Sequence, residues 1–176
     1  MKSAHSYAPG SSFTGSSAAG SAAFGFSLVE LMVVVTIFGI LAAIAVPSFK
    51  SLSQSQRISN ASYELYSGLS LTRSEAIKRN TNVTMAITSN TKNEVSWVIT
   101  DGTTPIRNQA YISGVAMTPA GLSGTQVAYQ RNGRPVLSAS TATFQIDATG
   151  VTTPTQYVRC VTIELSGMPR IRQGIC

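Results

Sequence analysis

Few residues of this chain have the types and spacing that catalysis or metal binding requires. The single histidine, His5, lies in a leading Ser/Ala/Gly-rich segment, and the chain has only two cysteines. Asp101 and Asp147 stand close to turn glycines, where aspartates commonly bond the local backbone. No nucleophile elbow, phosphate loop or paired-acid motif occurs. We therefore expect a structural or binding protein rather than an enzyme, with no cofactor and no metal site.

The most unusual chemical group is Glu30, the only charge between Phe26 and Pro47 in an otherwise apolar run. As a helix rising about 1.5 Å per residue, this run is long enough to cross the roughly 30 Å hydrocarbon core of a bilayer. A carboxylate at that depth costs on the order of a few kcal/mol unless it is paired. The charge therefore predicts a function beyond simple anchoring.

The segment around Glu30 resembles the N-terminal signature of type IV prepilins and type II secretion pseudopilins. From Gly25 it runs GFSLVELMVVVTIFGILAAIAVPSF. The resemblance implies that prepilin peptidase cuts between Gly25 and Phe26 and that the new N-terminus, Phe26, is methylated. It also implies that Glu30 pairs with the N-terminal amine of a neighbouring subunit, so that two groups that are costly in lipid neutralise each other. The alternative is an ordinary membrane anchor or an uncleaved secretory signal, neither of which requires this carboxylate.

The signature divides the chain into three parts. Residues 1–25 are the expected prepilin leader, residues 26–47 the transmembrane and assembly helix, and residues 48–176 one globular head. A head of this length can bury a core of its own. The resemblance implies a single-pass protein of the inner membrane with its head in the periplasm, incorporated into a pilus or a pseudopilus.

The charge distribution is unbalanced along the chain. The net charge is +6, and every charged residue except Lys2 and Glu30 lies beyond Pro47, so the head carries the positive excess. Such an excess fits either a solvated basic surface or attraction to a polyanion such as DNA. Because Lys50 and Arg57 follow the apolar run, a positive-inside count does not place the head outside. We follow the motif, since this count depends on very few charges.

The first part of the head is predicted to continue the helix to about residue 80. Apolar or small residues recur there at steps of three or four, which places them on one helix face: they are Ile58, Ala61, Leu65, Leu69, Thr72 and Ala76. The sequence Asn80-Thr81-Asn82 then supplies turn chemistry. The stretch Leu71–Asn80 resembles the end of this helix in the GspH/FimT branch of minor pilins and pseudopilins, and the chain is identified as a member of that branch.

After residue 82 the hydrophobic period changes to two, which predicts β-strands separated by glycine-containing turns. The expected strands are Val83–Ile87, Val95–Ile99, Gln109–Ile112, Gln126–Gln130, Pro135–Leu137, Thr143–Asp147, Gln156–Leu165 and Arg170–Gln173. One long helix followed by many short strands predicts the α+β class. Together with the resemblance, this pattern implies the type IV pilin fold, in which the helix packs on an antiparallel, β-rich head.

The two cysteines, Cys160 and Cys176, predict a disulfide if the domain is exported. Closing a loop of roughly 15 residues stabilises the fold by about 3 kcal/mol in the loop-entropy model. The bond would also hold a C-terminus that otherwise frays. Two free thiols are the alternative.

Arg170 and Arg172 stand two apart in the last expected strand, so their side chains should leave the same face. Arginines about 7 Å apart could contact successive phosphates of double-stranded DNA. The tail resembles the C-terminal region of FimT-type minor pilins, some of which bind DNA during natural transformation; here Met168-Pro169 replaces the arginine that follows the glycine there. A DNA-binding strand, with Arg131 and Arg134 as helpers, and a solvated edge strand both remain open.

Two functional classes are consistent with these features. The first is a minor pilin that takes part in type IV pilus assembly, with or without DNA capture. The second is a GspH-like minor pseudopilin of a type II secretion system. Either would have prepilin peptidase, other pilin or pseudopilin subunits and the inner membrane as partners. The basic tail and the cysteine pair favour the pilus.

Overall fold

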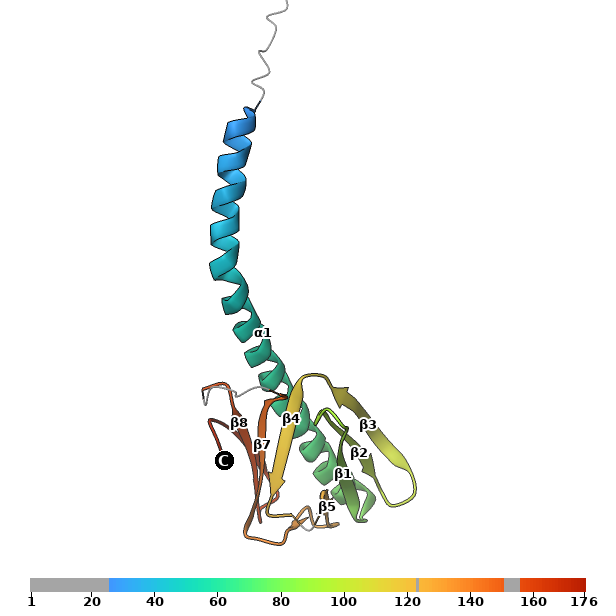
Figure 1. Ribbon diagram of the computed structural model, residues 1–176. Helices are drawn as coiled ribbons and strands as arrows, with labels where there is room; N and C mark the ends of the chain where they lie inside the picture. The colour runs from blue at the N-terminus through green and yellow to red at the C-terminus, as the bar shows by residue number, and fades with distance from the viewer. Residues whose placement is uncertain (1–25, 123, 151–155) are drawn as a thin grey trace, which may run out of the picture. The chain divides into compact units, whose positions relative to one another are not determined.

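The computed structural model describes residues 26–122, 124–150 and 156–176 (Figure 1). The expected leader, residues 1–25 with Gly25, lies outside the described residues. The chain forms two compact units, Met1–Ala42 and Ala43–Cys176. A single helix, α1 (Leu28–Arg79), contributes to both units and continues through Pro47.

The described part of the first unit is Phe26, Ser27 and the N-terminal portion of α1, and its apolar side chains are exposed. They include Phe26, Leu28, Val29, Leu31, Met32, Val33, Ile37, Phe38, Ile40 and Leu41. By length and composition, α1 is the one described helix that could cross a membrane. An apolar surface of this extent needs lipid or protein to cover it.

The second unit consists of the remainder of α1 and two antiparallel sheets. Sheet A has the order β3-β2-β1-β5-β6 and sheet B the order β4-β7-β8-β9. The strands of sheet A are β1 (Val83–Ser89), β2 (Val95–Thr100), β3 (Pro105–Ile112), β5 (Gln126–Tyr129) and β6 (Pro135–Val136). Those of sheet B are β4 (Val115–Ala120), β7 (Thr141–Ala148), β8 (Arg159–Glu164) and β9 (Pro169–Gln173). The predicted α+β pilin architecture is therefore confirmed.

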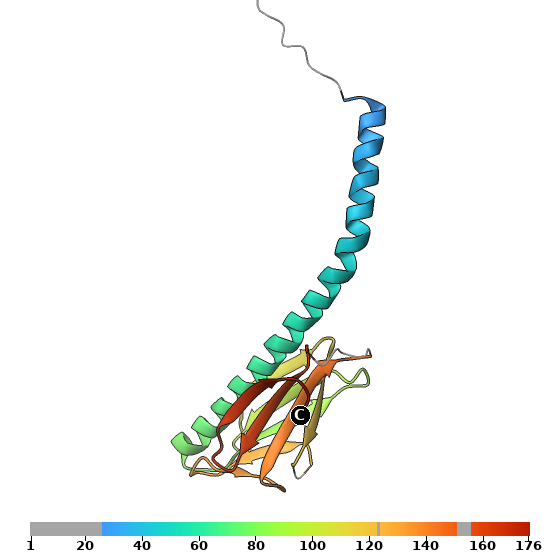
Figure 2. The same cartoon turned by 90° about the vertical axis from the view of Figure 1, so that its left-hand side faces the viewer.

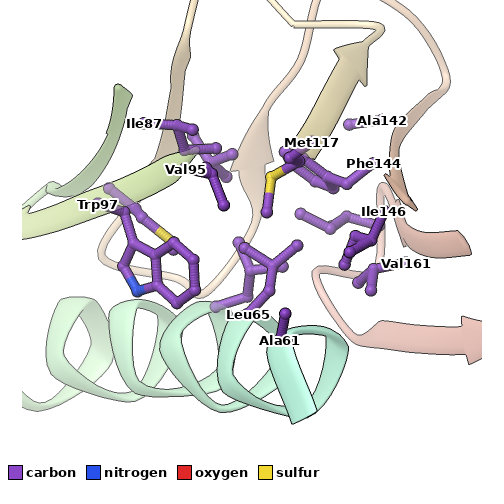
Figure 3. Packing of buried hydrophobic residues seen from close by; sticks show 14 of the residues in the cluster. Ala61, Leu65, Ile87, Val95, Trp97, Met117, Ala142, Phe144, Ile146 and Val161 are labelled. Carbon is purple, nitrogen blue, oxygen red and sulfur yellow. The ribbon is translucent and has the colours of Figure 1, made fainter. Parts of the chain in front are cut away.

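The core of the second unit lies where α1 meets both sheets. The predicted stripe on α1 is buried along its whole length, from Ile58 to Ala76. Ala61 and Leu65 point from the helix between Trp97 of β2 and Ile146 of β7 (Figure 3). Strand β7 alternates strictly, with its even-numbered side chains buried and its odd-numbered ones half-exposed, because only one face of the sheet contacts the core.

One strand is missing from the sequence prediction. Residues Val115–Ala120 form β4, which pairs with β7 from Val115↔Ala148 to Ala120↔Thr143. Pro119 interrupts the alternating pattern and argues against a strand on propensity alone. In the structure β4 lies at the edge of sheet B and has no partner strand on its outer side. On that side the missing N–H of a proline breaks no hydrogen bond between strands.

Candidate functional site

Glu30 lies in the first turn of α1, four residues after Phe26. A carboxylate at this end of a helix interacts favourably with the helix dipole. Glu30 belongs to none of the ion pairs found among residues 26–122, 124–150 and 156–176. Both Glu30 and Phe26 are exposed, so each is available to a neighbouring molecule.

The two arginines of the tail leave the same face of β9, as predicted. Arg170 and Arg172 are exposed, while Pro169 is buried. Strand β9 pairs with β8, with Thr162 opposite Arg170 and Cys160 opposite Arg172. Figure 2 shows these two C-terminal strands, in red, side by side in sheet B. The arginines therefore lie on the outer face of this sheet, away from the core.

The surroundings of this arginine pair are polar, with one opposing charge. A shallow hollow is lined by Thr141, Thr162, Glu164 and the two arginines. The hydroxyls can donate hydrogen bonds to an anion, whereas the carboxylate of Glu164 disfavours one. None of the ion pairs of the described residues includes Arg170 or Arg172.

Arg131 and Arg134 lie elsewhere, in the turn between β5 and β6. The turn is closed by the Gly133 N–H, which donates to the Gln130 carbonyl at 2.8 Å. Arg131 lines a separate polar hollow with Asn80 and its neighbours, beside the end of α1. The structure thus brings Arg170 and Arg172 together, but it does not bring Arg131 into their hollow.

The C-terminus is held against β8 by a disulfide between Cys160 and Cys176, with 5.2 Å between their Cα atoms. The Gly174 N–H also donates to the Val158 carbonyl at 2.9 Å. Cys160 is fully buried even though it points to the outer face of sheet B. The last residues consequently fix the end of the strand that carries the two arginines.

Arg73 of α1 connects the two sheets, a role that the sequence analysis did not assign to it. Its Nε donates to the Gly133 carbonyl at 3.1 Å, and its Nη2 donates to the Ser166 carbonyl at 3.4 Å. One side chain of α1 therefore holds the β5–β6 turn of sheet A and the β8–β9 turn of sheet B. The only signal in the sequence was its position within the helix-end motif Leu71–Asn80.

These two turns are in direct contact, and Gly167 makes the contact possible. A Cβ at Gly167 would lie 2.3 Å from the Gly133 carbonyl oxygen, and the φ of Gly167 is +80°. No L side chain fits that conformation and that space without displacement of the backbone. The hydroxyl of Tyr129 donates to the Gly167 carbonyl at 3.0 Å, and burial raises the pKa of this hydroxyl above its usual range.

A second polar cluster joins the end of α1 to the β2–β3 loop. Arg79 donates to Glu75 at 2.6 Å through Nε and to Asp101 at 2.7 Å through Nη1. The hydrogen bond from Arg79 lowers the pKa of Glu75, and the Thr104 N–H is the main cause of the lowered pKa of Asp101. This cluster joins structural elements, and the part of the chain that the structure describes contains no group of metal-binding side chains.

The exposed apolar helix and the two-sheet head define a protein of the pilin and pseudopilin class. The family described as type II transport protein GspH matches residues 61–167, and the chain therefore belongs to it. The prokaryotic N-terminal methylation motif matches residues 21–46. Members of this class are structural subunits that assemble with one another after processing by prepilin peptidase.

Solved structures provide a comparison of the fold. The type IV minor pilin FimU of Pseudomonas aeruginosa is 19% identical; the match covers 69% of this chain and 91% of that chain with a TM-score of 0.50. The minor pseudopilin EpsH from the type 2 secretion system of Vibrio cholerae is 16% identical; the match covers 66% of this chain and 97% of that chain with a TM-score of 0.49. No match was found among curated proteins.

Proposed function

We propose that this chain is a minor pilin that takes part in the assembly of a type IV pilus. The observation that carries the proposal is the exposed apolar N-terminal portion of α1 with Glu30 as its single charge. A surface of this kind is stable in a bilayer before assembly and between the helices of neighbouring subunits afterwards. The head has no part in catalysis in this proposal.

In this proposal, proteolytic processing creates the N-terminal amine with which the Glu30 carboxylate pairs. Cleavage between Gly25 and Phe26 would place a methylated amine at the start of α1, and this amine would pair with the Glu30 carboxylate of an adjacent subunit. Removing either group alone leaves the other uncompensated in an apolar environment. Intact-mass measurement of protein from the native host tests the cleavage, and a mature mass that still includes residues 1–25 would contradict it.

The pairing is tested with Glu30→Ala in the native host. We expect a cleaved protein that remains in the membrane and is absent from sheared filaments. The matched control is Thr36→Ala, because Thr36 lies in the same helix and donates to the Met32 carbonyl within it. Incorporation of the Glu30 variant at the wild-type level would show that the carboxylate has another purpose.

A GspH-like minor pseudopilin of a type II secretion system is the alternative, since that assembly uses the same type of helix. Deletion of the gene separates the two. Loss of surface pili with normal protein secretion supports the pilus, and the reverse result supports the pseudopilus. The basic β9 strand and the disulfide that fixes it favour the pilus in our proposal.

A second candidate function is contact with double-stranded DNA through β9. The favourable observation is that Arg170 and Arg172 are exposed on one face of a strand fixed by a disulfide. A pair of arginines on a strand contacts phosphates, not bases, so the contact would be independent of DNA sequence. Glu164 in the same hollow limits its strength.

A further inference from the structure

A basic groove lies at the end of the head where α1 enters it. It is lined by Lys50, Ser53, Gln54 and Arg57 of α1, together with Gly114 and Thr149. Ser53, Gln54 and Arg57 follow Lys50 by three, four and seven residues. The four side chains therefore form one stripe on one helix face. The Thr149 N–H donates to the Gly114 carbonyl at 3.3 Å, which joins the two loops that form the opposite wall.

No carboxylate among the described residues forms an ion pair with the cations of this groove. Lys50 and Arg57 are exposed, and neither belongs to an ion pair within the described ranges 26–122, 124–150 and 156–176. Arg57 Nη1 lies 3.5 Å from the position that a Cβ on Gly114 would occupy. The guanidinium therefore lies against the Gly114 turn, at the wall of the groove.

One carboxylate does reach the Gly114 turn. Glu94 accepts hydrogen bonds from the Gly114 N–H at 3.1 Å and from the Ser113 hydroxyl at 3.0 Å. The amide of Asn90 donates to its second oxygen at 2.9 Å. Because these three donors engage both of its oxygens, Glu94 is held by the turn and does not pair with Arg57.

The Lys50 end of the groove lies at the depth along α1 that is expected for the headgroup layer of a membrane. Lys50 follows Val46, the last apolar residue before Pro47, by four residues, or about 6 Å of helix. The headgroup region on each side of the hydrocarbon core is roughly 5–8 Å thick. Arg57 follows Val46 by eleven residues, about 16 Å of helix, and so lies beyond this layer. Helical side chains lean toward the N-terminus, so its long side chain points back toward the layer.

Apolar side chains flank the groove on the same helix. Phe49 lines the groove and is 71% exposed, and Leu52 is 56% exposed. Aromatic and aliphatic side chains next to cations are typical of protein surfaces that rest at the boundary between headgroups and acyl chains.

We propose that this groove binds the phosphate of an anionic phospholipid in the membrane leaflet that faces the head. Lys50 and Arg57 supply the charge, Ser53 and Thr149 supply hydroxyl donors, and Phe49 inserts beside the acyl chains. The proposal depends on the membrane anchorage of α1 in the proposed function. Lipid binding explains why Lys50 and Arg57 follow the apolar run on the side of the head, where the positive-inside rule does not predict positive charges.

The test uses the full-length protein in detergent micelles, titrated with phosphatidylglycerol, with phosphatidylcholine or with inorganic phosphate, and examined by native mass spectrometry. We expect retention of phosphatidylglycerol over phosphatidylcholine. Each cation near an anionic lipid surface contributes roughly fivefold in affinity, so Lys50→Gln/Arg57→Gln should weaken phosphatidylglycerol binding by about 25-fold. Both residues are exposed, so circular dichroism should show an unchanged fold.

The matched control is Arg131→Gln/Arg134→Gln, which removes the same charge from the β5–β6 turn. That turn contacts Arg73, roughly 24 Å further along α1 than Arg57, so binding of the lipid should be unchanged. Equal lipid retention by the wild type and the Lys50/Arg57 variant would overturn the proposal. Displacement of the lipid by inorganic phosphate at equal concentration would instead indicate a site for free phosphate.

Two further outcomes separate this inference from the proposed function. Carbonate extraction of native membranes tests the anchorage alone, and a wild-type protein that is extracted would contradict the anchorage. A Lys50/Arg57 variant that keeps the lipid but no longer enters filaments would overturn the lipid assignment and identify the groove as a contact between subunits.

Discussion

The hydroxyl of Tyr129 donates a 3.0 Å hydrogen bond to the carbonyl of Gly167. Tyr129 ends β5 of sheet A, and Gly167 lies in the β8–β9 turn of sheet B, so this bond joins the two sheets directly. Both residues are buried, and water therefore cannot replace the bond easily. Arg73 reinforces the same junction from α1.

Tyr129→Phe should destabilise the head by about 1–2 kcal/mol, because the buried Gly167 carbonyl loses its donor. The melting temperature of the full-length protein should fall by several degrees, as measured by circular dichroism. Tyr111→Phe is the control, since Tyr111 is 49% exposed on β3 and its melting temperature should not change. An unchanged melting temperature in the Tyr129 variant would show that the bond does not contribute.

Reduction of the Cys160–Cys176 disulfide should lower the free energy of unfolding by about 3 kcal/mol, the value for a loop of roughly 15 residues. The measurement is the denaturant midpoint with and without a reductant. Cys160→Ala/Cys176→Ala should be as unstable as the reduced protein and insensitive to the reductant. If the denaturant midpoint of the wild type does not change while thiol titration confirms reduction, the disulfide fixes the C-terminus without stabilising the fold.

The cluster of Glu75, Arg79 and Asp101 should make stability fall in acid. The pKa of each carboxyl is lowered in the folded state, first by Arg79 for Glu75 and first by the Thr104 N–H for Asp101. A lowered folded pKa stabilises the protein above the unfolded pKa, and this stabilisation is lost as the pH falls through the folded pKa. For Glu75 the loss begins below its ordinary value of 4.5.

Arg79→Gln removes the partner that Glu75 and Asp101 share, so the difference between the melting temperatures at pH 7 and pH 3 should shrink. Arg131→Gln removes the same charge from an exposed turn and should leave that difference unchanged. A pH dependence in the Arg79 variant equal to that of the wild type would mean that other carboxyls determine the acid sensitivity.

Contact with DNA should be weak, independent of sequence and sensitive to salt. Fluorescence polarisation of labelled duplex with the full-length protein in nanodiscs should give a dissociation constant of roughly micromolar or higher. Arg170→Gln/Arg172→Gln should weaken binding and reduce the log–log salt slope by about one unit for each lost phosphate contact.

The control for the DNA measurement is Lys92→Gln/Arg107→Gln, which removes equal charge from the β1–β2 turn and from β3. Equal weakening by both double variants would indicate attraction to the overall positive charge and not to β9. If the wild type does not bind duplex at low salt, the β9 strand is a solvated edge and the protein is purely architectural.

The main elements of this protein follow from local sequence periodicity. The apolar run with Glu30 predicts the exposed N-terminal helix, and the steps from Ile58 to Ala76 predict the buried stripe of α1. Eight of the strands were expected close to where β1, β2, β3, β5, β6, β7, β8 and β9 lie. Period and turn chemistry are properties of neighbouring residues, so one sequence is sufficient to find them.

Other features depend on contacts between residues far apart in the chain. Strand β4 was missed because Pro119 opposes a strand locally, and only its place at a sheet edge makes the proline acceptable. Arg73 meets Gly133 and Ser166 across about 60 and 93 residues of sequence, and no short-range pattern carries that information. The groove of Lys50 and Arg57 likewise exists only because the Gly114 and Thr149 loops fold back against α1.

The sequence by itself therefore determined the long helix, eight of the strands, the apolar helix face and the N-terminal methylation motif. The tertiary structure decided the order of the strands, the separation of Arg131 from the Arg170/Arg172 pair and the junction at Tyr129 and Gly167. The reason is physical: local propensity and amphipathic period act within a few residues, whereas strand order and polar contacts between elements depend on how the hydrophobic faces pack around one core.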